Sequence, residues 1–203
     1  MSDAANKKTF AFTAENEAKA QAHIAKYPEG KQQSAVMPLL YIAQAQIGDE
    51  TGTQGWLPIE AIEYIAEYLA MPYIRVYEVA SFYTMYNLRP VGKYHVQLCG
   101  TTPCWLKGSD DVMRACKDMG MEKGKTTEDG AFTLTEVECL GACVNAPMVQ
   151  INDDFYEDLD YDSTKQILQA LKAGETPKPG PQVQRHLAAP VGGPTTLKDK
   201  VVG

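Results

Sequence analysis

The first ninety residues carry apolar positions at helical spacing, separated by short polar turns. The clearest amphipathic stretch spans 58–70. It sets one apolar face against an acidic one: Ile59, Ile62, Ile65 and Leu69 against Glu60, Glu63 and Glu67. Two earlier helices are predicted to begin at the N-caps Thr13 and Ser34, with 48–52 as a polar loop. A further helix is predicted over 73–86, and we expect its aromatic residues to serve core or interface packing.

After residue 90 the pattern changes to the alternation typical of strands. Tyr94, Val96 and Leu98 alternate with polar residues and predict a strand with one buried face, which leaves His95 on the solvated side. Further strands are predicted over 132–138, 148–151 and 155–156, and helices over 109–119 and from Asp162 or Ser163 to 171. Strand, helix, strand, hairpin and helix make a small α/β layer structure.

The last thirty residues are rich in proline and glycine, which make up about one third of them, above the roughly 25–30% that is typical of non-globular segments. Two interpretations stay open, a disordered tail or an arm that becomes ordered along a partner subunit. The predicted organisation is therefore a helical region over 1–90, an α/β domain over 91–175 and a Pro/Gly-rich arm over 176–203.

Charge and hydropathy exclude several classes of protein. The formal net charge is −7, whereas a nucleic-acid or anionic-lipid binder needs a basic face. The longest apolar runs are far shorter than the roughly 20 residues that span a bilayer, so no membrane insertion is expected. The N-terminus carries no signal-like apolar segment, and we expect the protein in a cytosol-like compartment.

Four of the five cysteines form two close pairs. Cys99 and Cys104 enclose four residues, and Cys139 and Cys143 enclose three. Each pair begins where a predicted strand ends, so two loops can meet at one edge of the sheet. Gly100 and Gly141 allow close approach of the backbone, and Thr101 and Thr102 offer hydroxyl donors. The fifth cysteine, Cys116, falls on the apolar face of the helix over 109–119 and is expected in the core.

The spacing favours a two-iron, two-sulfide cluster but leaves alternatives open. Zinc is usually held by pairs with a two-residue gap, and gaps of four and three suit a core in which each pair grips one iron. Zinc, thiol–disulfide chemistry and plain buried thiols remain the alternatives. No other catalytic pattern is present, because His23, His95 and His186 are scattered and neither a dinucleotide fingerprint nor a nucleophile elbow occurs. By elimination the protein is expected to carry electrons.

Several stretches match a known family. The runs GWLPI at 55–59, RVYEVASFYTMY at 75–86, CGTTPC at 99–104 and VECLGACVNAPM at 137–148 are specific to it. Over about residues 13–195 the sequence resembles the E subunits of respiratory NADH–quinone oxidoreductase (complex I), whose mitochondrial counterpart is the flavoprotein 2 subunit. The resemblance implies an α+β architecture: an N-terminal helical region, a thioredoxin-like [2Fe-2S] ferredoxin domain and an extended C-terminal tail.

The resemblance also implies a site and partners. The ligands of one [2Fe-2S] cluster would be Cys99, Cys104, Cys139 and Cys143. FMN and NADH would be bound by a partner flavoprotein subunit, next to the large iron–sulfur subunit of the peripheral arm, with no nucleic acid involved. The location implied is the cytoplasmic side of the bacterial inner membrane, or the matrix side in mitochondria. Equivalent subunits of NAD-linked hydrogenases or formate dehydrogenases are the alternative assignment.

Two further expectations concern the surroundings of the cysteines. Acidic residues outnumber cations near them in the sequence, with Lys107 the one close cation: Asp110, Asp111, Glu136 and Glu138. This predicts a low reduction potential. The resemblance also raises the chance that the bond preceding Pro147 is cis, above the base rate of about 5–6%.

Overall fold

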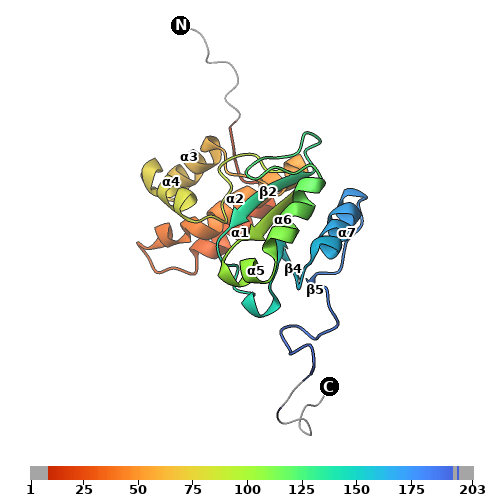
Figure 1. The fold of residues 1–203 in the computed structure, drawn as a ribbon. Coiled ribbons are helices and arrows are strands. Elements are labelled where there is room, and N and C mark those ends of the chain that lie inside the picture. Colours follow the sequence, from red (N-terminus) through yellow and green to blue (C-terminus); the bar gives the residue numbers. More distant parts are fainter. Residues whose placement is uncertain (1–8, 194–195, 197–203) are drawn as a thin grey trace. The chain divides into compact units, whose positions relative to one another are not determined.

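The computed structural model describes residues 9–193 and residue 196, and these form two compact units (Figure 1). The first unit ends at Val91, and its regular elements within the described residues are all helices. The second begins at Gly92 and contains a five-stranded sheet with helices packed on it. No helix within the described ranges is long and apolar enough to cross a membrane.

The N-terminal unit has four α-helices around a common apolar core. They are α1 (Ala14–Ile24), α2 (Val36–Thr51), α3 (Ile59–Tyr68) and α4 (Tyr73–Phe82), and a short 3₁₀ helix, η1 (Gln32–Ala35), precedes α2. Helix α2 is central and packs against the other three. The core is formed by fully buried aliphatic side chains that include Leu39, Leu40, Ile62, Ile65 and Val76.

The start of α1 confirms the predicted N-cap. Thr13 accepts a hydrogen bond from the backbone N–H of Asn16, and Glu15 and Glu17 stand in the first turn, where the helix dipole favours negative charge. Gln46 on α2 reinforces this cap, because its Oε1 accepts from Thr13 N at 3.0 Å. The same oxygen accepts from Asn16 Nδ2 at 3.0 Å, so α1 is tied to α2 at its first turn.

The boundaries of α2 differ from the prediction at both ends. Ser34 lies inside η1 and is not an N-cap; α2 begins after Ala35 with no side-chain cap. The predicted loop over 48–52 is the last turn of α2, which ends where Gly52 takes a left-handed conformation. Gly48 allows this, because a Cβ there would lie 2.9 Å from the Thr53 carbonyl oxygen of the returning chain.

The aromatic residues predicted to pack are only partly buried. Tyr86 is in the core, but Phe82 is 77% exposed, and Tyr73, Tyr77 and Tyr83 are also exposed. Ile59, predicted on the apolar face of α3, is 56% exposed, since it occupies the first position of the helix.

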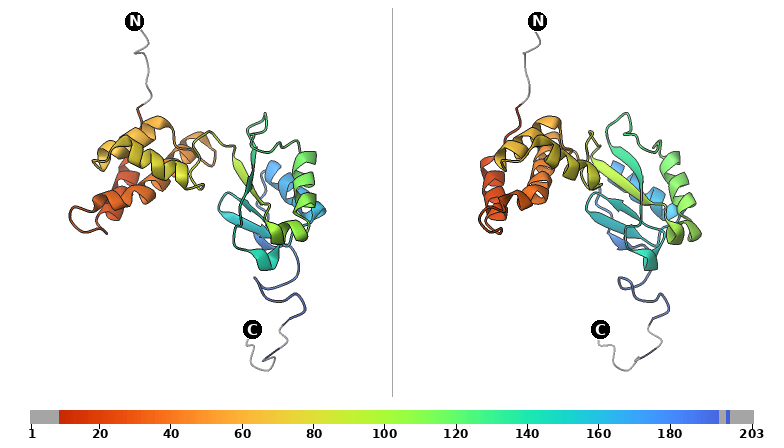
Figure 2. Two further views of the ribbon diagram at one scale, coloured as in Figure 1. Left: turned by 60° about the vertical axis from the view of Figure 1, so that its left-hand side comes forward. Right: turned by 90° about the vertical axis from the view of Figure 1, so that its left-hand side faces the viewer.

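The second unit contains one mixed sheet in the order β2-β1-β3-β4-β5. The strands are β1 (Tyr94–Cys99), β2 (Phe132–Val137), β3 (Val149–Ile151), β4 (Asp154–Glu157) and β5 (Gly180–Pro181). Strand β1 runs parallel to β2 and antiparallel to β3, and β3 and β4 form a hairpin. The helices are α5 (Thr102–Leu106), α6 (Ser109–Asp118) and α7 (Tyr161–Lys172), and α6 and α7 lie side by side on one face of the sheet (Figure 2).

In the core between this sheet and the helices α6 and α7, the position of Cys116 confirms a prediction. The burial of His95 and the start of α7 each differ from what the sequence predicted. Cys116 is fully buried among apolar side chains, as its position on the helix predicted. His95, predicted on the solvated side, is only 7% exposed, because β1 lies between β2 and β3 and the ring packs against Thr135 of β2. Helix α7 begins slightly earlier than predicted, with Asp160 as N-cap in a reciprocal capping box with Ser163.

The C-terminal segment is ordered along its own domain as far as the structure describes it. Strand β5 pairs in parallel with β4, and Tyr156 Oη donates to the carbonyl of Pro177 at 3.4 Å. Neither interpretation of the Pro/Gly-rich arm anticipated this, because composition does not report long-range pairing. The last part of the predicted arm, residues 194–195 and 197–203, lies outside the described residues.

Candidate metal centre

The two cysteine-bearing loops begin at one edge of the sheet. Strands β1 and β2 run parallel, and their last residues, Cys99 and Val137, face each other in register. The chain leaves β1 into the short helix α5, which carries Cys104. It leaves β2 into a loop with Cys139, followed by the 3₁₀ helix η2 (Cys143–Asn145). The parallel pairing therefore brings both loops together.

The four thiols form an inner and an outer pair. Cys99 and Cys104 are each 1% exposed and hydrogen-bond to each other, while Cys139 and Cys143 are exposed, with their sulfur atoms 3.4 Å apart. All four are free thiols. Across the described ranges, no three His, Cys, Asp or Glu side chains are grouped around a point that would hold a single metal ion. The contacts between sulfur atoms lie within each pair.

Hydrogen bonds favour the thiolate form of one cysteine in each pair. Burial raises the pKa of Cys99, but hydrogen bonds from the hydroxyl and backbone of Thr101 and from the Leu140 backbone outweigh it, and the net pKa is lowered. The Gly141 backbone N–H and the Cys143 thiol lower the pKa of Cys139. Gly141 has φ +86°, which a residue with a side chain rarely adopts, so the glycine places its N–H at this sulfur.

The second thiol of each pair is held in its protonated form. Burial and the neighbouring Cys99 raise the pKa of Cys104 to about 12. Cys139 raises the pKa of Cys143 through a hydrogen bond. This division is the one expected when two like groups share a proton.

A cation that sequence spacing did not identify lies in the pocket beside Gly100, the residue that follows Cys99. Lys123 forms an ion pair with Glu136, although the sequence showed Lys107 as the one close cation. The Glu136 carboxylate in turn lies against Gly100, where a Cβ would be 2.4 Å from its Oε1. These residues line a pocket of about 440 Å³ together with Thr101, Thr102, Val137 and Glu138. Lys123 reaches this place through a bridge with Leu134, which no local pattern predicts.

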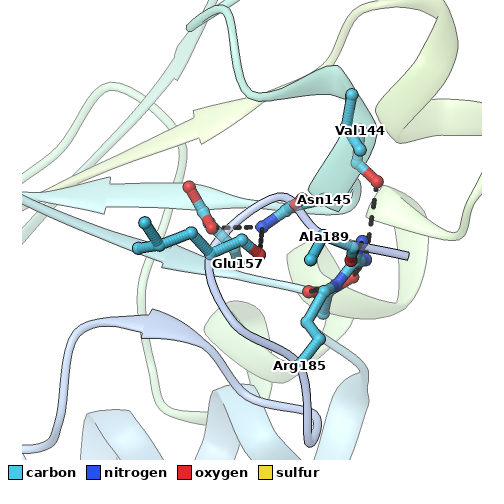
Figure 3. Close-up of polar contacts among 7 residues, drawn as sticks. Val144, Asn145, Glu157, Arg185 and Ala189 are labelled. Carbon is cyan, nitrogen blue, oxygen red and sulfur yellow. Dashed lines mark hydrogen bonds and ion pairs between the residues drawn. The ribbon is translucent and has the colours of Figure 1, made fainter. Parts of the chain in front are cut away.

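The outer loop has polar support that the sequence analysis also missed. Asn145, two residues after Cys143, is 3% exposed and hydrogen-bonds to β4 and to the C-terminal segment (Figure 3). Arg185 from that segment reaches the carbonyl of Val144. The bond between Ala146 and Pro147, directly after this turn, is cis, a conformation whose chance the resemblance raised above the base rate.

Comparison with known proteins identifies the family of this chain. Residues 20–172 match the thioredoxin-like [2Fe-2S] ferredoxin family. The E subunit of NADH-quinone oxidoreductase from Rickettsia conorii is 58% identical over 164 residues, which cover 80% of this chain and 95% of that protein. The same subunit from Rickettsia typhi is 56% identical over 162 residues, which cover 79% of this chain and 92% of that protein.

A solved structure supports the fold alone. The NAD⁺-reducing [NiFe]-hydrogenase in its air-oxidized state is 17% identical with a TM-score of 0.56, over 68% of this chain and 23% of that chain. The hydrogenase chain is thus much longer, and the likeness concerns only a part of it. Since the family match extends over three quarters of the sequence and the Rickettsia subunits match most of it, the chain belongs to the thioredoxin-like [2Fe-2S] ferredoxin family.

Proposed function

We propose that this protein is an electron-transfer subunit of an NADH:quinone oxidoreductase, with one [2Fe-2S] cluster held by Cys99, Cys104, Cys139 and Cys143. The observation that carries the proposal is the pairing of these thiols at the adjacent ends of the parallel strands β1 and β2. The named relatives, which are E subunits of that enzyme, support the assignment to this complex rather than to a hydrogenase or a formate dehydrogenase.

The donor set fits such a cluster. A [2Fe-2S] core takes four thiolates, two at each iron, and the protein offers its four thiols as two close pairs. Hydrogen bonds to Cys99 and Cys139 already favour thiolates there. When bound, the cluster supplies a carrier for one electron. The exposure of the outer pair leaves that side of the site open to a partner protein.

The same geometry argues against thiol–disulfide exchange by Cys99 and Cys104. Exchange needs an accessible thiolate, but both residues are 1% exposed. The pair is thus poorly placed to attack an external disulfide.

The partners follow from the proposed complex. A flavoprotein subunit would bind NADH and FMN and exchange electrons with the cluster on this chain. The large iron–sulfur subunit of the peripheral arm would be the second neighbour. The site of action would be the cytoplasmic side of the bacterial inner membrane, or the matrix side of the mitochondrial one.

The test is to purify the protein without oxygen and to record absorption and EPR spectra before and after dithionite, with iron and sulfide assays. Two irons, two sulfides and a paramagnetic signal on reduction are expected. Substituting serine at each of the four proposed ligands should lower the iron content or alter the EPR signal. The matched control is Cys116→Ala, which removes a thiol from the core and should retain the wild-type cluster. A zinc-loaded protein, or one that stays colourless after reconstitution, would contradict the proposal.

A further inference from the structure

The segment that follows β5 returns to the turn that begins at Cys143. We call residues 182–189 the strap. The Gln182 backbone N–H donates to the carbonyl of Glu157 at 2.9 Å, at the end of β4. Further along, the carbonyl of Leu187 accepts a hydrogen bond from Asn145 Nδ2 at 3.1 Å. The strap is therefore attached both to the sheet and to the turn η2.

Arg185 is the central polar residue of the strap. Its Nε donates to Asp158 Oδ2 at 2.8 Å, and its Nη2 contacts the other oxygen of that carboxylate, so the two side chains form a forked pair. Both side chains are less than one tenth exposed. The guanidinium also donates to the carbonyls of Val144 at 3.5 Å and Ala189 at 3.4 Å. Arg185 thus joins the strap to the residue directly after Cys143.

Residues at and just after the end of β4 also hold the turn η2. Asp158 donates its backbone N–H to the carbonyl of Asn145 at 2.7 Å. Asn145 Nδ2 donates to Glu157 Oε2 at 2.6 Å as well as to Leu187, so both of its amide donors are engaged. The turn η2 is consequently fixed between the end of β4 and the strap, although its first residue, Cys143, is itself exposed.

We infer that Arg185 is a positioning residue for the iron–sulfur site, and that the strap fixes the turn from which Cys143 reaches the cluster. The inference rests on the proposed function, because it assigns Cys143 as a ligand. Groups outside the ligand shell orient the ligands, and their loss typically weakens metal binding by about 10–100-fold. A turn released from Arg185 would let Cys143 move away from the metal and would change the environment of its sulfur.

The experiment uses the full, cluster-loaded protein and compares Arg185→Ala and Arg185→Lys with the wild type. The control is Lys178→Ala, which removes a positive charge from an exposed side chain close to the strap. Iron loss to a chelator, the midpoint potential and the EPR g-values are measured.

Arg185→Ala should lose iron about tenfold faster or more, with a shifted potential and altered g-values. Arg185→Lys, which keeps the charge without the fork, should fall between. Lys178→Ala should match the wild type within a factor of two.

The outcomes separate the two proposals. If the wild-type protein itself binds no iron and sulfide, the proposed function fails. If it binds the cluster and Arg185→Ala behaves like the wild type, the strap has no positioning role. Faster iron loss with an unchanged potential and g-values would indicate general loosening of the fold and would also overturn the inference.

A measurement on the wild type covers the case in which Arg185→Ala does not fold. In the cluster-loaded protein, hydrogen–deuterium exchange of the Gln182 amide reports whether the strap is closed. Exchange at least tenfold slower than in a free peptide supports the inference. Exchange at the free-peptide rate would mean that the strap does not hold the turn.

Discussion

His95 and Thr135 meet across the parallel pair β1–β2, where His95 Nε2 lies 2.9 Å from Thr135 Oγ1. The histidine is 7% exposed, and burial lowers the pKa of its imidazole below the ordinary value of 6.5. The ring is therefore a neutral hydrogen-bonding group inside the domain, four residues before the first proposed ligand.

This burial predicts a pH dependence of stability. As the pH falls below about 6.5, the unfolded chain takes up a proton that folded His95 still resists, so the free energy of unfolding decreases. Between pH 7.5 and 5.5 the wild type should lose more stability than His95→Gln, by at most about 1.4 kcal/mol per pH unit below the unfolded pKa. Urea unfolding of the cluster-free protein at both pH values measures this. Equal losses in the two proteins would contradict it.

A second prediction concerns the loop after α2. Gly55 has φ +79°, and a Cβ there would lie 2.0 Å from the carbonyl oxygen of Gln44 and 2.9 Å from the backbone nitrogen of Gly48. Left-handed strain together with a collision against backbone should make Gly55→Ala cost at least about 3 kcal/mol. Gly52→Ala is the control, since its φ is +66° but no atom lies within 4 Å. It should cost only about 1–2 kcal/mol. Urea unfolding followed by circular dichroism compares the two, and similar costs would refute the argument.

Structural features that depend on residues close together in the sequence could be predicted from local patterns. The spacing of apolar residues predicted α3 and β1, and Thr13 was identified as an N-cap because the cap hydrogen bond is local. The two cysteine pairs were assigned to one edge of the sheet because each follows a strand.

The features that were missed depend on tertiary contacts. The last turn of α2 was predicted to be a loop, but it is helical because the returning chain packs onto Gly48. His95 is buried because β1 lies between two other strands, which alternation along one strand cannot report. Lys123 lies 13 positions before its partner Glu136, and Arg185 lies 27 positions after its partner Asp158. The composition of the C-terminal arm gave no sign of the pair between Arg185 and Asp158. No local pattern indicated the pair between Lys123 and Glu136.

The capping box of α7 provides a third prediction. Asp160 accepts from the backbone N–H of Ser163 at 2.8 Å, and hydrogen bonds from the side chain and backbone of Ser163 lower the pKa of Asp160. Asp160→Ala should destabilise the protein by about 0.5–2 kcal/mol at pH 7. Since the pKa is lowered on folding, this contribution is complete above about pH 3.9 and is lost as the pH falls through the folded value. Urea unfolding at pH 7 and pH 5 should give the same difference from the wild type. The exposed neighbour Asp162, substituted by alanine, should have the smaller effect.

The ion pair of Lys123 and Glu136 provides the fourth prediction, which modifies the expectation of a low reduction potential. Lys123 offsets one of the acidic residues near the inner thiols, so Lys123→Ala should shift the midpoint to more negative values and Glu136→Gln to more positive ones. A unit charge about 10 Å away in water changes the energy of the added electron by about 0.4 kcal/mol, or roughly 20 mV. Because Lys123 is 62% exposed, the shift should shrink as salt is added. Redox titration followed by EPR at low and high ionic strength measures both effects.

Lys125→Ala is the control, because Lys125 pairs with Glu122 and does not line the pocket beside Gly100. Equal shifts for the two lysine variants would show that net charge, and not the position of Lys123, sets the potential.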